Sequence, residues 1–438
     1  MRRTRTIFAM SMLVGATLAF AQSASAATCR NTANFDRWLA DFKNEAVQKG
    51  ISPQVIAAVS PYMVFSQRII NHDRAQGVFN QSFLTFSDRM TAGYRQKNGL
   101  AQMKKHAALF AKVEQEFGVP AAPLTAFWGL ESDYGRNTGK SNVFTAITTL
   151  AYDCRRGEYF RENLLDALRI VQKGDLTVED MLGGDWAGEL GAMQFTASDY
   201  FRSAVDYDGD GRRDLVKSTP DTVASAANFL KSLGWKRGEP WMLEVRIPQT
   251  LRWEETGLEV KHPVSQWSKW GVRGAHARLP DGNLQASLLL PMGRHGPAFL
   301  VFENFTVLMG WNQSMVYVTT VAYFATRLDG APPVSRGAPD IELLDIQQAR
   351  ELQRLLIKNG HDIGEVDGKV GEKTRGAIKK MQIKLGLPAD SWPTSELIRR
   401  MGGTAAPAAP RAEARDDPRQ RRRQQQREPR SPFPFFQR

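Results

Sequence analysis

Apolar residues recur at helical spacing through most of the first 230 positions of the chain. The stretches that show this spacing are 35–42, 55–59, 163–174 and 224–233. Residues three and four apart lie on one face of a helix, so each stretch predicts a helix that buries one side. We therefore expect the N-terminal half of the chain to be mainly helical.

Shorter apolar runs replace the helical pattern further along the chain. The segments 243–248, 286–290 and 298–302 have the length and the residue types of strands. Helical spacing returns at 317–328. These runs predict a small β subdomain inserted between helices, and so an α+β fold that is mainly α.

The N-terminus has the layout of a secretory signal peptide. Three arginines precede an apolar run over 7–20, and Ala24-Ser25-Ala26 supplies a small-residue cleavage site. The apolar run is too short to span a membrane. We expect residues 1–26 to be removed and the mature protein to lie in the periplasm of a Gram-negative bacterium.

Clusters of Gly and Pro mark the boundaries of the expected domains. We expect a main domain over 27–330, a linker over 331–342 and a small helical domain over 343–402. Residues 403–438 are rich in Pro, Ala, Arg and Gln, a composition that predicts a disordered tail. The basic run of this tail is either a solvated surface or a tether to other envelope proteins.

The chain has two cysteines, Cys29 and Cys154, and both follow the signal segment. In an oxidising compartment, an even number of cysteines favours one disulfide between them. Two buried free thiols are the alternative.

The formal net charge of +12 is concentrated at the two ends of the chain. The signal segment carries three arginines, and the last 36 residues carry nine against four acids, which leaves +4 for the folded part. A nucleic-acid binder would interleave basic and aromatic residues within its folded part, so this class of protein is disfavoured. A modestly basic exported protein suits a polyanionic envelope surface.

The stretch 124–135 contains the most unusual residue of the chain. Pro120 precedes this stretch and Gly135 is the expected stop, so we expect a helix between them. Glu131 falls on the apolar stripe of that helix, where Phe127 is a neighbour. Because a carboxylate is seldom buried without a partner, this position calls for an explanation.

Two interpretations of Glu131 remain open from the residues alone. It is either a structural carboxylate held by an Arg or by backbone N–H groups, or a catalytic acid whose pKa is raised by apolar and aromatic neighbours. Asp133 lies roughly 200° around the helix from Glu131, so the two cannot form a pair of catalytic carboxylates. Glu131 therefore acts alone or not at all.

The segment 184–195 alternates small residues with one amide and several large apolar side chains. This pattern suits a wall that a ligand can approach closely. Gln194 would then bind a substrate amide or orient Glu131. The alternative is a core amide, and the residues alone do not distinguish the two.

The segment 206–217 has the spacing of an EF-hand calcium loop, with acids at positions 1, 3, 5 and 9 and Gly at position 6. Lys217 stands at position 12, where the bidentate Glu belongs, and Asp221 is the nearest substitute. We therefore expect a weak, structural Ca²⁺ site at most; a turn held by its own side chains is the alternative. The candidate ligands are Asp206, Asp208, Asp210, Arg212, Asp214 and Asp221.

The chain resembles the lytic murein transglycosylases of the B type over about 29–330. The motifs that carry the resemblance are Phe127-Trp128-Gly129-Leu130-Glu131-Ser132, Thr149 to Arg156, Trp186 to Phe195, Asp206 to Asp214 with Ala224 to Asn228, Asn304-Phe305, and Trp311 to Tyr317. The resemblance implies a lysozyme-like catalytic domain in which Glu131 is the sole catalytic carboxylate.

The same resemblance implies a set of substrate-binding residues. Gln194, Asn312 and Tyr317 match the family pattern. Trp311 stands where Tyr is usual and Asp185 where Ser is usual, and both are included as candidate substrate contacts. Ala192 and Ala197 also depart from the usual Gln and Pro.

The region 343–402 resembles a peptidoglycan-binding domain of the three-helix type. Its marks include Leu352-Gln353, Val366-Asp367-Gly368 and Gln382. Met381 replaces the usual Phe, and Ser391 replaces the Gly of a late Asp-Gly turn. A generic helical spacer is the alternative.

The resemblance implies a reaction that needs no cofactor. Protonated Glu131 would cleave the bond between N-acetylmuramic acid and N-acetylglucosamine in glycan strands, and the sugar's own 6-hydroxyl would close onto the anomeric carbon. A muramidase of the same fold and a non-catalytic wall-binding protein are the alternatives. Zinc amidase or peptidase chemistry is disfavoured because the six histidines show no metal-binding spacing.

Overall fold

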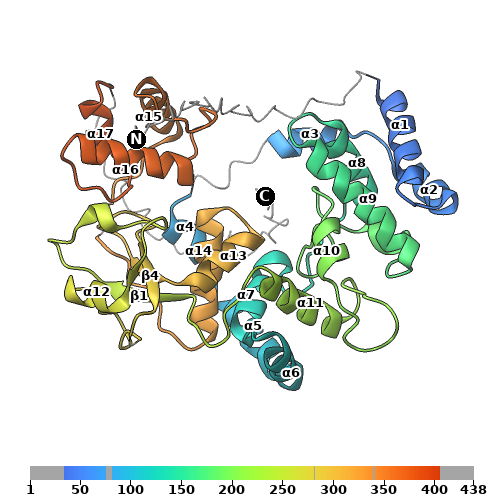
Figure 1. Ribbon diagram of the computed structural model, residues 1–438, viewed down its shortest axis with the longest axis horizontal. Coiled ribbons are helices and arrows are strands. Elements are labelled where there is room, and N and C mark those ends of the chain that lie inside the picture. The colour runs from blue at the N-terminus through green and yellow to red at the C-terminus, as the bar shows by residue number, and fades with distance from the viewer. Residues whose placement is uncertain (1–33, 75–80, 281, 339–340, 405–438) are drawn as a thin grey trace, which may run out of the picture.

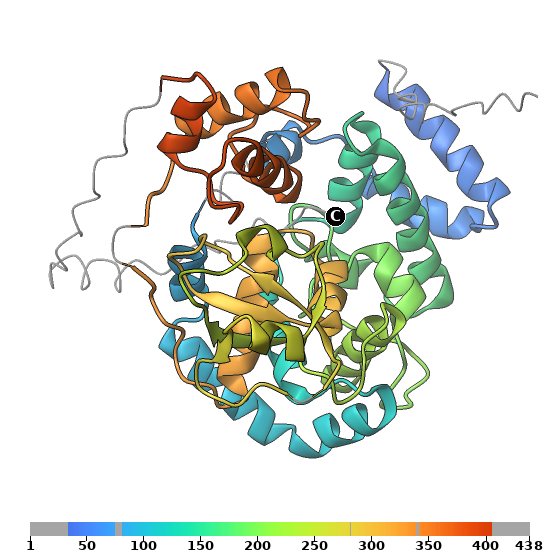
Figure 2. The same cartoon turned by 60° about the vertical axis from the view of Figure 1, so that its left-hand side comes forward.

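The computed structural model describes residues 34–74, 81–280, 282–338 and 341–404 (Figure 1). The predicted signal peptide, Cys29 and the predicted disordered tail lie outside the described residues. Within the described part, no helix combines the length and the apolar composition that crossing a bilayer requires. Helices dominate, as predicted, and a small sheet lies between them and the C-terminal helices (Figures 1 and 2).

The N-terminal helices follow the predicted apolar stripes. Trp38 and Phe42 are buried aromatic side chains of the first helix, and Ile56 and Val59 are the buried aliphatic side chains of the second. Helices up to the sheet are α1 (Phe35–Gln48), α2 (Pro53–Val59), α3 (Gln67–Arg74), α4 (Phe83–Met90), α5 (Gly93–Lys105), α6 (Ala107–Phe117), α7 (Ala121–Ser132), α8 (Val143–Tyr152), α9 (Gly157–Lys173), α10 (Ala197–Ser203) and α11 (Thr219–Ser232), with 3₁₀ turns at Ser60–Tyr62 and Glu179–Leu182.

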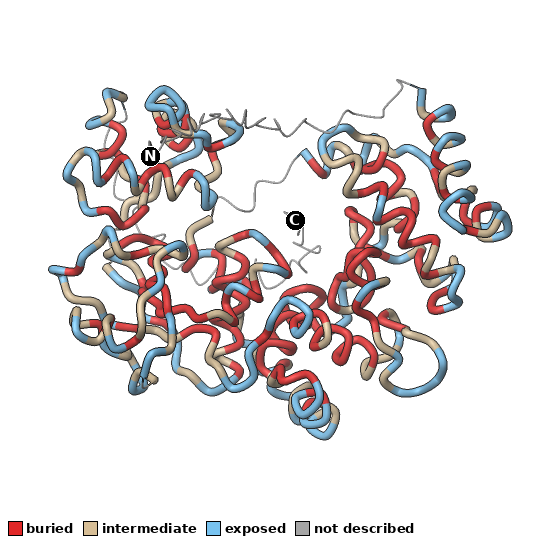
Figure 3. Tube along the Cα trace, viewed as in Figure 1, coloured by how far each residue is buried: buried red, intermediate tan, exposed pale blue. Residues whose placement is uncertain are grey.

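Helix α7 runs through the centre of the main core, and nearly every residue from Ala122 to Ser132 is buried (Figure 3). It begins directly after Pro120, as predicted, but it ends at Ser132 rather than near Gly135. Asp133 and Tyr134 adopt φ values of 51° and 62°, and their backbone N–H groups bond to carbonyls of the last turn. These left-handed residues stop the helix before the glycine is reached.

Two glycines let α7 and α5 approach each other closely. The Tyr134 hydroxyl donates a hydrogen bond to the Arg95 carbonyl at 2.7 Å. A Cβ on Gly99 would lie 2.5 Å from that hydroxyl, and a Cβ on Gly129 would lie 2.6 Å from it. Both positions therefore exclude a side chain, and the end of α7 is fixed against α5.

The predicted β subdomain is present, with an antiparallel sheet in the order β2-β4-β5-β1-β3. The three strands that were predicted are β1 (Met242–Arg246), β4 (Gln285–Leu289) and β5 (Ala298–Val301). The two-residue strands β2 (His262–Pro263) and β3 (Arg273–Gly274) were not predicted, because they are too short to show alternation. Helix α12 (Val264–Lys269) packs beside them, and a 3₁₀ turn covers Trp253–Glu255.

The chain returns from the sheet to the main core through α13 (Glu303–Trp311) and α14 (Met315–Leu328). Helix α14 was predicted, whereas α13 was not. Helix α14 packs against α7 and α4, and it is buried almost throughout. Asn304 in α13 donates to the carbonyls of Lys236 and Glu239 at 2.8 Å each, which ties α13 to the loop before the sheet.

The C-terminal helices α15 (Ile346–Lys358), α16 (Glu372–Lys384) and α17 (Ser395–Arg400) form a module with its own small core. Two buried glutamines hold its turns in the same way. Gln353 accepts from the N–H of Gly368 at 2.7 Å, and Gln382 accepts from the N–H of Ser391 at 2.9 Å. The module is therefore built from two related turns, one with Gly and one with Ser in the left-handed conformation.

Side chains of the module hold it against the β subdomain. Arg375 donates to the carbonyls of Leu290 and Pro291, at 2.5 and 3.3 Å, and Lys379 donates to the carbonyl of Thr256. A separate ion pair joins Arg294 to Asp390 at 3.1 Å. The module and the sheet therefore share an interface in which most of the acceptors are backbone carbonyls.

Candidate active site

Glu131 lies in the last turn of α7 and is only 1% exposed. Burial of this carboxylate was expected from its place on the apolar stripe. Asp133 lies beyond the end of the helix and pairs with Arg95 at 3.6 Å. Asp133 therefore faces a cation of α5.

Two aromatic side chains hold one oxygen of Glu131. The indole Nε1–H of Trp311 donates to Oε1 at 3.1 Å, and the Tyr317 hydroxyl donates to the same oxygen at 2.5 Å. Trp311 and Tyr317 are themselves buried, at 1% and 0% exposure. Hydrogen bonds in such a dry setting are stronger than the same bonds in water.

The Trp311 ring is fixed by packing on three sides. It stacks on Phe127 of α7, with ring centroids 4.2 Å apart, and it contacts Phe195 and Phe229 at 5.2 and 5.4 Å. A ring with this many neighbours has little freedom to turn. The direction of its N–H toward Glu131 is therefore set by the core.

The turn between α13 and α14 places these donors. Trp311 is the last residue of α13, Asn312 caps it, and Tyr317 lies in the first turn of α14. Asn312 is 1% exposed, and its side-chain oxygen accepts from the N–H of Ser314 at 2.8 Å. Its Nδ2 group is buried and makes no hydrogen bond within the described part of the chain.

The segment 184–195 is fastened to the end of α7. The Ser132 hydroxyl donates to the Ala192 carbonyl, and Gln194 donates to the carbonyls of Gly191 and Thr138 at 2.8 and 3.2 Å. Gln194 has a φ of 50°, in the left-handed region that favours glycine. Such a conformation needs support, and the two hydrogen bonds of its own side chain supply it.

Asp185 holds the beginning of the same segment. Its Oδ1 accepts from the N–H groups of Ala187 and Glu189, at 2.8 and 2.9 Å. Burial raises the pKa of Asp185 to about 7, although these hydrogen bonds act in the opposite direction. Trp186 follows it and stacks on His72, with the ring centroids 5.0 Å apart, a contact that sequence reasoning did not anticipate.

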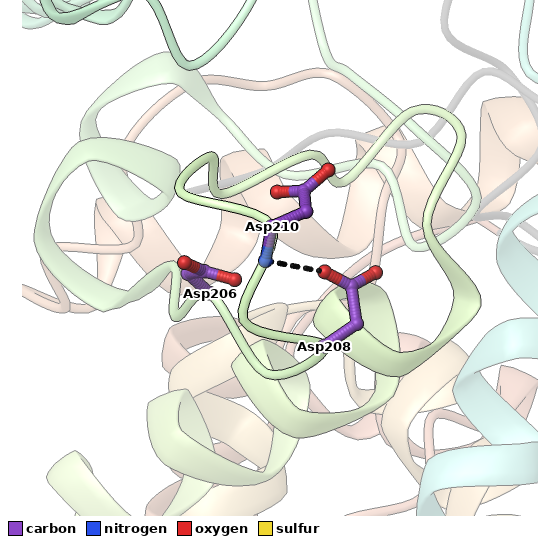
Figure 4. A group of neighbouring side chains, drawn as sticks. All are labelled: Asp206, Asp208 and Asp210. Atoms are coloured by element: carbon purple, nitrogen blue, oxygen red, sulfur yellow. Dashed lines mark hydrogen bonds between the residues drawn. The ribbon is translucent and has the colours of Figure 1, made fainter.

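Three of the predicted calcium ligands gather in one loop (Figure 4). Asp206, Asp208 and Asp210 are exposed, and one carboxylate oxygen of each lies within 4.8 Å of the others. Each carboxylate also accepts from a loop N–H, as when Asp208 accepts from the N–H of Asp210 at 3.3 Å. The geometry is therefore compatible with both interpretations of this segment, a calcium loop and a self-supported turn. Its carboxylates are close enough to share an ion, and they also hold the turns of the loop by hydrogen bonds.

The other predicted ligands have different partners. Asp221 is fully buried and accepts from the N–H groups of Tyr207 and Asp214, at 2.8 Å each. Asp214 accepts from the N–H of Lys217 at 2.9 Å. Arg212 donates to the Asp175 carbonyl at 3.0 Å, and its guanidinium lies 3.9 Å from the Asp214 carboxylate. Of the six candidate ligand residues, the structure therefore places the side chains of three, Asp206, Asp208 and Asp210, close enough to share one ion.

The family models agree with this architecture. The transglycosylase SLT domain matches residues 34–326, which is more than half of the chain, and a peptidoglycan binding domain matches residues 346–401. The first match contains Glu131 and its hydrogen-bond donors. The second match contains the helical module with the two glutamine-held turns.

Solved structures and a curated relative show the same likeness. The crystal structure of SltB3 from Pseudomonas aeruginosa in complex with NAG-anhNAM-pentapeptide is 37% identical, with a TM-score of 0.77, and the likeness covers 84% of this chain and 99% of that one. The Escherichia coli lytic transglycosylase Slt35 in complex with calcium is 25% identical, with a TM-score of 0.58, over 66% of this chain and 92% of that one. The membrane-bound lytic murein transglycosylase B of Escherichia coli (strain K12) is 28% identical over 245 residues, which are 55% of this chain and 66% of the relative.

The two family models lie in this order along the chain, and the likeness to SltB3 is long enough to span both of them. Together they extend over helix α7 and over the C-terminal module. The chain therefore belongs to the transglycosylase SLT domain family, and it carries a peptidoglycan-binding domain behind its lysozyme-like core.

Proposed function

We propose that this protein is a peptidoglycan lytic transglycosylase in which Glu131 is the single acid and base. One observation carries the assignment of Glu131. Its carboxyl is buried at the end of α7, and one of its oxygens is held by two hydrogen-bond donors from another part of the chain. Family membership supports the reaction class, and this geometry supports the choice of Glu131.

The two donors determine where Glu131 carries its proton. An indole N–H can donate but cannot accept, so the oxygen that faces Trp311 must offer a lone pair. A carbonyl oxygen is a better acceptor than a carboxylic hydroxyl, so two donors on Oε1 favour placing the proton of the neutral acid on Oε2. Because Oε1 also accepts from Tyr317, the negative charge that appears when Oε2 gives up its proton is stabilised at once.

The reaction divides into two proton transfers through that oxygen. In the first, Oε2 protonates the glycosidic oxygen between N-acetylmuramic acid and N-acetylglucosamine, and the bond to the anomeric carbon breaks. In the second, the carboxylate takes the proton of the muramoyl 6-hydroxyl while that oxygen bonds to the anomeric carbon. No water is consumed, Glu131 returns to its acid form, and the product ends in a 1,6-anhydro ring.

An intramolecular nucleophile explains why one carboxylate is enough. Hydrolytic glycosidases use two carboxyl groups, the second to activate water or to form a covalent intermediate. Here the attacking hydroxyl belongs to the same sugar, and its high effective concentration takes the place of that activation. The pairing of Asp133 with Arg95 fits this scheme, because the nearest acid in sequence is already occupied.

We assign substrate contacts to the polar groups around Glu131. The Nδ2 group of Asn312 is a buried donor without an acceptor in the described part, and an acetamido or hydroxyl oxygen of the sugar would satisfy it. Gln194 and Asp185 support the wall formed by 184–195. Trp311 and Tyr317 act mainly through Glu131, so we assign them as positioning residues.

The test of this proposal is the chemistry of the cut ends. Purified wild-type protein should convert sacculi into fragments that end in 1,6-anhydromuramoyl groups, which mass spectrometry detects as a loss of one water relative to reducing ends. Glu131→Gln keeps the shape of the side chain but cannot transfer the proton, so activity should fall by at least ~10²–10⁴-fold. Reducing ends from the wild-type protein would make it a muramidase.

Binding to sacculi separates a dead enzyme from a misfolded one. The module that contains residues 346–401 should keep the Glu131→Gln protein on sacculi in a sedimentation assay. A Glu131→Gln protein that still cuts would refute the role of Glu131. We further propose domain limits of 27–330 and 343–402 with a linker between them, and a periplasmic location after removal of residues 1–26.

We also propose that the loop of Asp206, Asp208 and Asp210 binds Ca²⁺ weakly. Three carboxylates within 4.8 Å of one another favour a divalent cation. Lys217 stands where the bidentate Glu belongs and pairs with Asp180 at 2.5 Å, and Asp221 is held by backbone N–H groups, so the affinity should be far below that of a calcium sensor. Supporting this, the calcium complex of Slt35 is among the structures that this chain resembles.

A melting experiment tests the calcium proposal. Millimolar Ca²⁺ should raise the melting temperature of metal-stripped protein, and Asp210→Asn should reduce that rise. Asp210 suits this test because its side chain is exposed and holds only one N–H of the loop. An unchanged melting temperature would mean that the segment is only a turn.

A further inference from the structure

A cavity of about 380 Å³ opens on the side of the catalytic domain away from Glu131. Gly118 and Pro120 line it, and they directly precede α7, whereas Glu131 lies in the last turn of that helix. At 1.5 Å per residue, the two ends are about 15 Å apart. The cavity is therefore separate from the site of glycan cleavage.

The floor of this cavity is aromatic and apolar. Trp235, Trp241, Met242, Phe299 and Tyr323 contribute to it, from the loop before the sheet, from β1, β5 and α14. The indole N–H groups of Trp235 and Trp241 already donate to the carbonyls of Gly118 and Ala322, at 3.0 Å each. These two indole N–H groups are therefore not available to a ligand, which would contact the faces and edges of the aromatic rings instead.

The rim of the cavity is acidic. Glu114, Glu239, Glu244 and Asp329 line it, and no Lys or Arg does so among the described residues. Glu244 is paired with His276 at 3.1 Å, but the other three carboxylates form no ion pair within the described part of the chain. Burial raises the pKa of Asp329. The cavity thus selects for an apolar, aromatic ligand that carries positive charge.

The last residues of this chain have that chemistry. Residues 418–438 contain seven arginines against one acid, Glu428, and Phe433-Pro434-Phe435-Phe436 lies two residues before their end. Phe433 is 29 residues beyond Thr404, the last described residue, and an extended chain of that length reaches up to about 100 Å. The tail is therefore long enough to reach the cavity from the module.

We propose that the Phe-Pro-Phe-Phe segment at 433–436 docks in this cavity, with the arginines around it facing the acidic rim. The rings of the segment cover the exposed part of the aromatic floor, and proline limits the entropy lost on docking. The rim charges attract the tail over several ångströms and weaken with salt. Docking would bring the C-terminal end of the chain to a fixed place on the catalytic domain and does not depend on the lytic reaction.

Photo-crosslinking in the full-length mature protein tests the docking directly. A benzoylphenylalanine in place of Phe435 should form crosslinks within its own chain to peptides that contain residues 235–244 or 323–332, as mapped by mass spectrometry. The same probe in place of Gln425 should label these peptides far less. Crosslinks near Glu131, on the C-terminal module or between two copies would overturn the proposal.

Charge reversal at the rim supplies the matched comparison. Glu239→Lys together with Asp329→Lys should lower the yield of the cavity crosslink about tenfold, because attraction becomes repulsion at two points. Glu365→Lys makes the same change at an exposed acid on the module that does not line the cavity, and it should leave the yield unchanged. Equal yields in the rim double variant and the control, with both proteins folded, would also refute docking at this cavity.

Discussion

The hydrogen bond from Tyr317 to Glu131 offers the sharpest test of how this site works. Tyr317→Phe removes a single oxygen from a side chain that is fully buried, so the ring stays in place and the packing of α14 is nearly unchanged. What is lost is a donor that lies 2.5 Å from Oε1. The variant therefore isolates the stabilisation of negative charge on Glu131.

The magnitude follows from the burial and the charge. A hydrogen bond to a charged group contributes about 1.5–3 kcal/mol, and the dry setting favours the middle of this range or above. Taking about 2 kcal/mol for the charge that develops as Oε2 gives up its proton, the rate of the chemical step should fall roughly thirtyfold. Trp311 continues to donate to the same oxygen, so the loss should stop short of that of Glu131→Gln.

The assay is the initial rate of release of anhydromuramoyl fragments across a range of pH. A carboxylate that loses a donated hydrogen bond holds its proton more tightly, so the alkaline limb of the profile should move to higher pH. Tyr323→Phe makes the same chemical change further along α14, where the hydroxyl accepts from the N–H of Val334, and it should leave the profile in place. A Tyr317→Phe protein with wild-type rate and profile would refute the reasoning.

Three further predictions concern stability and covalent structure. Ser391 has a φ of 61°, a left-handed conformation that glycine adopts without strain, so Ser391→Gly should stabilise the module by up to ~1 kcal/mol in denaturant unfolding. Gly368→Ala should destabilise the module, because a Cβ at this position would lie 2.7 Å from Ile346. The pKa of Asp185 is about 7 in the folded protein, whereas that of an unfolded Asp is about 4. The folded state therefore binds the proton more tightly, and the free energy of unfolding falls as pH rises between these two values. The melting temperature of Asp185→Asn relative to wild type should accordingly increase over this pH range and stay constant above it. Thiol titration of the denatured, unreduced mature protein should find no free thiol if Cys29 and Cys154 are bonded, and two free thiols would contradict the disulfide.

Local patterns predicted the mainly helical class, several individual elements and the unusual position of Glu131. The stripes of α1, α2, α9 and α14 are amphipathic, and the runs of β1, β4 and β5 have the length of strands, so both kinds of element show in the sequence. Helix α13 was not predicted, although Phe305, Leu308 and Trp311 are buried and recur at helical spacing. It is only nine residues long and follows the apolar strand β5 almost directly, and a short apolar run of this kind does not separate helix from strand.

The partners of Glu131 could not be predicted from local patterns. Trp311 and Tyr317 lie 180 and 186 positions after it, and only the packing of α7 against α14 brings them together. The resemblance to a known family marked both residues for substrate binding, and their contact with Glu131 became visible only in the fold. In the calcium loop, spacing likewise could not show that Asp221 is used up by backbone N–H groups.

The interface between the module and the sheet has an evolutionary consequence. Arg375 and Lys379 reach across it to the carbonyls of Leu290, Pro291 and Thr256, and a carbonyl is present whatever residue carries it. Substitution of Leu290, Pro291 or Thr256 should therefore have little effect on how the module docks, because the carbonyl remains. Substitution of Arg375 or Lys379 would remove the donor itself. At these carbonyl contacts the constraint falls on the side chains of the module, whereas the Arg294–Asp390 ion pair fixes one side chain on each face.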